Sequence, residues 1–323
     1  MPLLSNLSGA KNINEGATRA LRGNRNLCLE KRPIASWLAV DLSFKDHLVY
    51  SRVPIVLGAM LLMIVSVIYT EIPFFSFISI ASIACATLAI YSIYSFNSWT
   101  DFDEDQVNSP EFAAVGLRSK GSILAMSLIT GILSAMLSIL LGLLAAATVL
   151  FVLLVGLLYS NPVLKALRIP RFKEITLFKN VIIAFLWALL VTVPFLASGT
   201  AMDLVVSLLI LFVFLQILIE SISRDLPDSQ GDAKAGFSTI PSVFGLKNTL
   251  ALLLIMNTIS VIVIIACATL IFFTSLILIG CAWRYWVLFL LFEERPLAFT
   301  FAKINFPVFL ALAVGAILGK LFV

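Results

Sequence analysis

Nine apolar segments, each about long enough to cross a lipid bilayer, occupy most of this 323-residue chain. A transmembrane helix needs about 20 predominantly apolar residues, because each residue adds about 1.5 Å and the hydrocarbon core is about 30 Å thick. Backbone polar groups find no water in that core, so an uninterrupted apolar run satisfies them as a helix. The predicted spans are residues 53–69, 73–96, 121–140, 142–159, 176–197, 203–222, 248–268, 270–290 and 304–322.

The composition agrees with a polytopic membrane protein and excludes an ordinary soluble domain. Hydrophobic residues make up 61% of the chain, charged residues make up 12%, and the mean hydropathy is +1.07. An average soluble domain is about 25% charged. We therefore predict an all-α, nine-helix bundle with the lipid bilayer as its partner. The formal net charge of +4 gives no reason to expect a nucleic-acid partner.

The basic residues predict how the chain is oriented, because lysine and arginine accumulate on the cytosolic side of membrane proteins. With a cytosolic N-terminus, every one of the 22 basic residues except Lys320 is assigned to that side, counting Lys179 and Arg284, which fall within their spans, with the adjoining cytosolic segments. The C-terminus then lies on the opposite side. Residues 1–33 are predicted to form a polar, basic cytosolic tail, and residues 34–323 a transmembrane domain. That domain would begin with an amphipathic surface helix over residues 34–50.

Acidic residues cluster directly after the second span. Asn97, Asp101 and Asp105 are spaced by four residues, so on a helix they lie along one face. Like charges at this spacing repel each other by about 0.2–0.5 kcal/mol per pair, which favours a bound cation. Their oxygen atoms are the hard ligands that suit Mg²⁺.

A second acidic cluster follows the sixth span, where Asp225, Asp228 and Asp232 are spaced by three and four residues. Both clusters follow even-numbered spans, so the predicted topology puts them on the same, cytosolic side. Mg²⁺ is typically held by one or two carboxylates plus substrate phosphates. Two facing clusters therefore predict a diphosphate ligand.

The two motifs together resemble those of the UbiA superfamily of intramembrane prenyltransferases. Asn-x-x-x-Asp-x-x-x-Asp precedes the third span, and Asp-x-x-Asp-x-x-x-Asp with a following Gly-x-x-Thr-x-Pro follows the sixth. The resemblance implies a UbiA-like bundle with a cytosolic cap built from the loops after spans two and six. It also implies Mg²⁺-dependent transfer of a prenyl group from an isoprenyl diphosphate donor to a lipophilic or aromatic acceptor. Pathways of the quinone, chlorophyll, tocopherol or ether-lipid type use such reactions.

The resemblance also assigns roles to individual residues. Asn97, Asp101 and Asp105 would hold one Mg²⁺, Asp228 and Asp232 would hold the other, and Asp225 matches an additional acidic position. Asp101, Asp105, Asp228 and Asp232 are the predicted catalytic residues. The predicted diphosphate-binding residues are Arg52, Arg118, Lys120, Lys165, Lys179 and Lys234. The predicted substrate-contacting residues are Tyr94, Tyr159 and Ser160.

The chain departs from the family pattern in two places. Ser98 stands where many members have aspartate, and residues 108–114 contain no arginine, which many members carry there. The class of acceptor therefore stays open.

Three other functions fit parts of the pattern. An EF-hand Ca²⁺ loop would need glycine and glutamate where the chain has Gln106 and Phe112. A cation transporter would place ionisable groups near the middle of its spans, whereas these acids follow the spans. A UbiA-type terpene cyclase would carry the same motifs and ionise the same diphosphate without an acceptor, so it is the main alternative.

Overall fold

The computed structural model describes residues 53–70, 72–101, 110–161, 171–176, 178–227, 238–266, 271–293 and 306–321. For residues 53, 110–119, 271–275, 306 and 320–321 the description covers the backbone alone. All of these residues belong to the second of the two units into which the chain divides, Met1–Val40 and Asp41–Val323. The predicted tail over 1–33 and the predicted surface helix over 34–50 lie outside the described residues.

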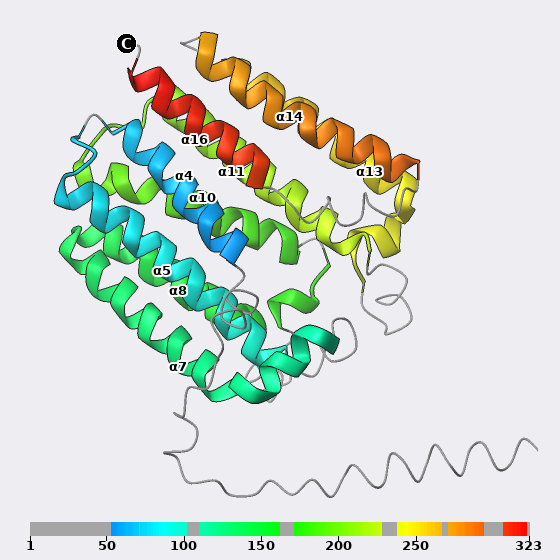
Figure 1. Cartoon of the computed structure of the whole chain (residues 1–323), viewed down its shortest axis with the longest axis horizontal. Coiled ribbons are helices and arrows are strands. Elements are labelled where there is room, and N and C mark those ends of the chain that lie inside the picture. The colour runs from blue at the N-terminus through cyan, green and yellow to red at the C-terminus, as the bar shows by residue number, and fades with distance from the viewer. Residues whose placement is uncertain are drawn as a thin grey trace, which may run out of the picture. The chain divides into compact units, whose positions relative to one another are not determined.

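Nine α-helices and one short 3-10 helix account for most of the described residues, which contain no β-strand (Figure 1). They are α4 (Val53–Ile68), α5 (Phe77–Thr100), α7 (Pro110–Leu140), α8 (Leu143–Ser160), η2 (Phe172–Glu174), α10 (Phe178–Ser198), α11 (Leu204–Asp225), α13 (Ile240–Ala266), α14 (Ile271–Phe292) and α16 (Phe306–Leu321). Six of them, α5, α7, α8, α10, α11 and α13, are long and apolar enough to cross a membrane. The predicted all-α membrane bundle is confirmed, and each predicted span coincides with one α-helix.

Two helices begin well before the spans predicted for them. α7 begins at Pro110 instead of residue 121, and α13 begins at Ile240 instead of residue 248. Hydropathy does not reveal these first turns, because they contain polar and charged residues. Proline is favoured at a helix start, where its missing N–H breaks no hydrogen bond, and both helices have one there. Gly245, with φ of 77°, kinks α13 where its first turn meets the apolar span.

Helices α5 and α7 are joined by reciprocal hydrogen bonds from small side chains to backbone carbonyls. The Ser92 hydroxyl donates to the Ser127 carbonyl, and the Ser127 hydroxyl donates to the Ser92 carbonyl, both at 2.8 Å. Further along, the Ser134 hydroxyl donates to the Cys85 carbonyl, also at 2.8 Å. Lipid removes the hydrophobic drive for helix pairing, so close packing of small residues and hydrogen bonds take its place.

Helix α5 also approaches α8 closely, at Gly156. A Cβ atom built on Gly156 would lie 2.5 Å from Cδ1 and 2.7 Å from Cγ1 of Ile93. Ile93 precedes Asn97 by one turn, and Gly156 precedes Ser160 by one turn, so this contact and the two helix ends share one interface. Glycine therefore sets the separation of α5 and α8 immediately beside the first acidic motif.

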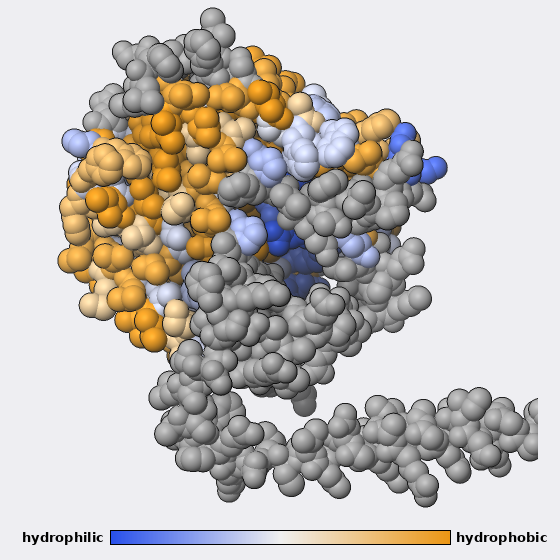
Figure 2. Space-filling view, in the orientation of Figure 1, coloured by the Kyte–Doolittle hydropathy of each residue, from blue (hydrophilic) through white to orange (hydrophobic). Residues whose placement is uncertain are grey.

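The surface separates apolar from polar residues. Apolar side chains cover much of the helix surface in Figure 2, and strongly hydrophilic side chains gather in a hollow near the middle of that face. Large exposed apolar side chains include Ile132 on α7 and Leu154 on α8, which are 60% and 59% exposed. An apolar surface of this extent is expected of helices that contact lipid.

Candidate active site

The last turn of α5 carries the start of the first acidic motif. Asn97 lies in that turn, and Asp101 caps the helix with its backbone N–H donating to the Asn97 carbonyl at 2.9 Å. The side-chain oxygen of Asn97 accepts a hydrogen bond from the hydroxyl of Ser160, the last residue of α8. Asn97 and Asp101 thus lie one helical turn apart at the end of α5. Asp105 lies outside the described residues.

Lys173 in η2 contacts the first motif and was not among the predicted site residues. Its Nζ atom lies 2.5 Å from Oδ1 of Asp101, and the two side chains are 11% and 13% exposed. η2 is held in shape by Arg171, whose guanidinium and backbone N–H both donate to the Glu174 carboxylate. The sequence signal for Lys173 was a run of basic residues between two spans, and such a run does not indicate which member turns inward.

Asp225, the first aspartate of the second motif, is the last residue of α11. Side chains from the first turn of α10 bind its carboxylate. Lys179 Nζ lies 2.8 Å from Asp225 Oδ1, and both side chains are 15% exposed. The Asn180 side-chain amide donates to Asp225 Oδ2 at 3.2 Å and to the Ser221 hydroxyl at 2.9 Å. These charge-assisted bonds fix the position of the carboxylate.

Tyr159 interacts with both acidic motifs. It lies beside Ser160 at the end of α8 and interacts electrostatically with Asp101, with Asp225 and with Tyr94. The ends of α5, α8 and α11 and the start of α10 therefore border a common polar space. This space is at one end of the bundle, and α16 ends at the other (Figure 1).

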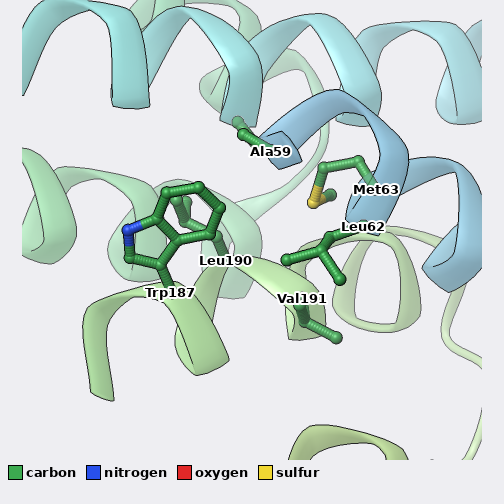
Figure 3. A pocket seen from close by; sticks show the side chains of 7 residues that line it. Ala59, Leu62, Met63, Trp187, Leu190 and Val191 are labelled. Carbon is green, nitrogen blue, oxygen red and sulfur yellow. The ribbon is translucent and has the colours of Figure 1, made fainter. Parts of the chain in front are cut away.

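A narrow apolar pocket lies within the bundle. Its walls come from α4, α5 and α10, and consist of Ala59, Leu62, Met63, Ala86, Trp187, Leu190 and Val191. Figure 3 shows Trp187 of α10 lying across from Ala59 of α4. The Trp187 ring also meets the Tyr94 ring edge to face, with centroids 6.5 Å apart. Because Tyr94 is one turn from Asn97, Trp187 links the apolar pocket to the first motif.

The other predicted site residues are placed differently or lie outside the description. Lys120 Nζ lies 5.9 Å from the centroid of the Trp99 ring, in a cation–π arrangement near the end of α5. Outside the described residues are Arg52, Lys165, Asp228, Asp232 and Lys234, together with the side chain of Arg118. Within the residues that are described, no group of three or more His, Cys, Asp and Glu is arranged to hold a metal ion.

Comparison with known protein families identifies the family of this chain. The model of the UbiA prenyltransferase family matches residues 53–312. The chain belongs to this family. The resemblance drawn from the two acidic motifs is thereby confirmed. No curated protein sequence matches the chain.

Solved UbiA homologues share the fold over most of their length. One from Aeropyrum pernix K1, without ligand, gives a TM-score of 0.67 at 18% identity, covering 86% of this chain and 99% of its own. One from Archaeoglobus fulgidus, bound to GPP and Mg²⁺, gives a TM-score of 0.63 at 18% identity. The match covers 84% of this chain and 99% of the homologue. A digeranylgeranylglyceryl phosphate synthase gives a TM-score of 0.59 at 24% identity. The match covers 84% of this chain and 98% of the synthase. The UbiA architecture therefore extends over most of the chain.

Proposed function

We propose that this UbiA family member is a Mg²⁺-dependent enzyme that transfers a prenyl group from an isoprenyl diphosphate to a lipophilic or aromatic acceptor. One observation carries the proposal: the first acidic motif and the second acidic motif border the same polar space, and each presents a carboxylate to a lysine. Homologues of the same fold bind DMAPP or GPP together with Mg²⁺, which supports the same ligand class here.

The residues at this end of the bundle fit a hard divalent cation. Asn97, Asp101 and Asp225 offer amide and carboxylate oxygens, which Mg²⁺ prefers, and the lysines show that each carboxylate is arranged to accept a positive charge. We propose that these three residues hold the metal together with Asp105, Asp228 and Asp232. Bound Mg²⁺ would neutralise the charge that develops on the leaving diphosphate.

Lys173 and Lys179 take a second role in this proposal. The lysine ammonium is a compact charge on a flexible stem, so it can pair with a carboxylate or with a phosphate. When metal ions occupy the carboxylates, the two lysines become free to bind the diphosphate oxygens. Lys179 was among the predicted diphosphate-binding residues, and Lys173 is added to them because of its contact with Asp101.

The apolar pocket is proposed to hold the prenyl chain of the donor. A prenyl chain placed along α4, α5 and α10 would be kept from water, which would otherwise quench the allylic carbocation. The Trp187 ring lines this pocket and packs against the Tyr94 ring, one turn from Asn97, and the π-faces of these rings can stabilise positive charge. Tyr159 and Ser160 are proposed to border the substrates from α8.

We also propose that the acidic end of the bundle and the N-terminus face the cytosol, with the C-terminus on the opposite side. The support is the distribution of lysine and arginine, which follows the cytosolic side of membrane proteins.

The test is diphosphate release by the purified protein in detergent, given geranylgeranyl diphosphate with and without Mg²⁺ and a panel of acceptors. We expect release that requires both Mg²⁺ and one acceptor. Asp225→Asn should lower it about 100- to 1000-fold, the usual effect of removing electrostatic stabilisation at a reacting centre. Asp203→Asn is the matched control, because Asp203 caps the opposite end of α11 and asparagine caps equally well.

The possible outcomes separate the hypotheses. Release without acceptor, yielding a hydrocarbon or alcohol, would favour the cyclase alternative. A Mg²⁺-independent release, or equal activity of Asp225→Asn and Asp203→Asn, would overturn the proposed site.

A further inference from the structure

One short segment contacts both acidic motifs. It runs from η2 into the first turn of α10, and we call it the connector. Its described residues are 171–176 and 178–180. Near its start, Lys173 pairs with Asp101 of the first motif at 2.5 Å, and near its end, Lys179 pairs with Asp225 of the second motif at 2.8 Å. The connector therefore holds two carboxylates that belong to distant parts of the chain.

Hydrogen bonds order the connector on either side of its middle. In η2, the Glu174 carboxylate accepts from the Arg171 guanidinium at 2.8 Å and from the Arg171 backbone N–H at 3.0 Å. Between the two lysines, the Thr176 hydroxyl donates to the Ser238 carbonyl at 2.8 Å, just before α13 begins. η2 also packs against α8 and α10. These contacts tie the positions of the two lysine residues to one ordered segment.

The two ion pairs are largely withdrawn from water, because all four side chains are only 11–15% exposed. A charge buried to this extent needs a partner of opposite sign, and removing one partner leaves the other strongly destabilised. Asp101 and Asp225 can therefore accept a metal ion only by giving up a lysine. The displaced lysine in turn needs an anion, and a diphosphate supplies one. Metal and diphosphate binding should then favour each other through the lysines.

We propose that Lys173 and Lys179 are built-in counter-ions of the two acidic motifs, and that the connector moves both from carboxylate to diphosphate in one concerted exchange. This inference rests on the proposed function and adds a form of regulation to its site. The lysines compete with the metal while the donor is absent and assist binding once the donor is present. Such coupling is reciprocal, so Mg²⁺ and the diphosphate raise each other's affinity by the same factor.

The experiment measures Mn²⁺ binding to the purified full chain in detergent, from the electron paramagnetic resonance signal of free Mn²⁺. Mn²⁺ takes the same oxygen ligands as Mg²⁺. Each protein is titrated alone and with a non-reactive thio analogue of geranyl diphosphate, and a titration of the analogue without protein corrects for Mn²⁺ bound in solution.

The variants separate charge from the connector's position. Lys173→Met and Lys179→Met each remove one counter-ion, and Lys247→Met, which removes an exposed charge from α13, is their control. Thr176→Val breaks the bond to Ser238 without changing any charge. Its control is Thr192→Val, because the Thr192 hydroxyl bonds only within α10, to the Leu189 carbonyl.

Without the analogue, we expect each lysine-to-methionine variant in the connector to bind Mn²⁺ about 10- to 100-fold more tightly than the wild type, the range for hydrogen bonds to charged groups. The analogue should raise the Mn²⁺ affinity of the wild type, and this gain should shrink in both variants by a similar factor. Thr176→Val should bind Mn²⁺ alone about 2- to 10-fold more tightly, because a neutral hydrogen bond that favours the lysine-paired arrangement is lost. Both controls should match the wild type.

Lysine variants that bind Mn²⁺ alone no more tightly than the wild type would overturn the inference, since the lysines would then not compete for the carboxylates. Wild-type binding by Thr176→Val would overturn the concerted exchange. If Lys173→Met does not fold, Lys179→Met and Thr176→Val decide the question. Failure of the proposed function has a separate sign: the analogue would leave Mn²⁺ affinity unchanged in every protein, although the lysine variants would still bind the metal alone more tightly. That result would overturn the exchange onto diphosphate along with the proposed function.

Discussion

Replacement of Gly156 by alanine tests how the acidic site is held together. The added Cβ would lie 2.5, 2.7 and 3.0 Å from Cδ1, Cγ1 and Cγ2 of Ile93, whereas carbon atoms in contact lie about 3.5–4.0 Å apart. Ile93 cannot rotate out of the way, because both of the positions that face Gly156 hold γ carbons. Any other staggered rotamer leaves at least one of them filled. Helices α5 and α8 must therefore move apart by roughly 1 Å to restore ordinary contact.

The size of the effect follows from this geometry. Overpacking of a close-packed interface typically costs about 1–3 kcal/mol, and we expect Gly156→Ala to destabilise the protein by that amount. The same displacement would separate Ser160 from Asn97, one turn further along the interface. Misplacement by about 1 Å can lower a rate about 100-fold. The free energy of unfolding in mixed detergent–SDS micelles and Mg²⁺-dependent diphosphate release measure the two effects.

Three companion variants make the test specific. Ile93→Ala removes all three clashing atoms and should cancel most of the added cost of Gly156→Ala in a double-mutant cycle. Ile93→Val removes Cδ1 alone and leaves both γ carbons, so it should restore little. Gly131→Ala on α7 brings its Cβ to 2.7 Å from the Ser92 hydroxyl. That hydroxyl can rotate at the loss of one hydrogen bond, worth about 0.6 kcal/mol in a membrane protein.

If the Gly156→Ala protein has the same free energy of unfolding as the wild type, the steric explanation is wrong. Rescue by Ile93→Val as complete as rescue by Ile93→Ala would also refute it, since the γ carbons would then not be what keeps the helices apart.

Four further predictions follow from the site and the topology. Asp101→Asn should lower Mg²⁺-dependent turnover about 100-fold or more while the protein stays folded, as judged by its circular dichroism; near-normal turnover would exclude Asp101 from the metal site. Lys173→Gln should raise KM for the donor about 10- to 100-fold, because a charged partner of the diphosphate is lost; an unchanged KM would restrict Lys173 to positioning Asp101. Ala86→Leu should narrow the apolar pocket and lower kcat/KM for long donors more than for short ones; equal losses for all lengths would place the prenyl chain elsewhere. A reporter fused to the C-terminus should give a non-cytosolic signal in cells, and a cytosolic signal would contradict the proposed orientation.

Much of the helix arrangement could be predicted because membrane spans are set by local composition. The apolar runs leading to Asn97 and Ser160 were long enough to require helices, whatever packed around them. The placement of Asp101 and Asp225 at the same end of the bundle also followed from simple alternation, since both come at the end of an even-numbered span. Distances within that end of the bundle, in contrast, depend on tertiary contacts.

The parts that escaped prediction depend on packing between distant segments. Arg284 was counted among the basic residues of the cytosolic side although it falls within the predicted span over 270–290, and the structure buries it within α14. Lys173 contacts Asp101 only because η2 turns back against α8 and α10. The role of Gly156 depends on the side chain that faces it on α5. Hydropathy and spacing along one segment carry no information about such partners.

The serine pairs between α5 and α7 bear on the order in which the bundle assembles. These helices are neighbours in the chain, and their bonds join residues separated by 35 and 49 positions. Contacts between neighbouring segments form at a small loss of chain entropy, so we expect this hairpin to pair soon after it enters the membrane. The helix that bears Asn97 would then be braced before α8, α10 and α11 arrive. On this view the helix that ends in the first acidic motif is the template around which the later helices of the bundle assemble.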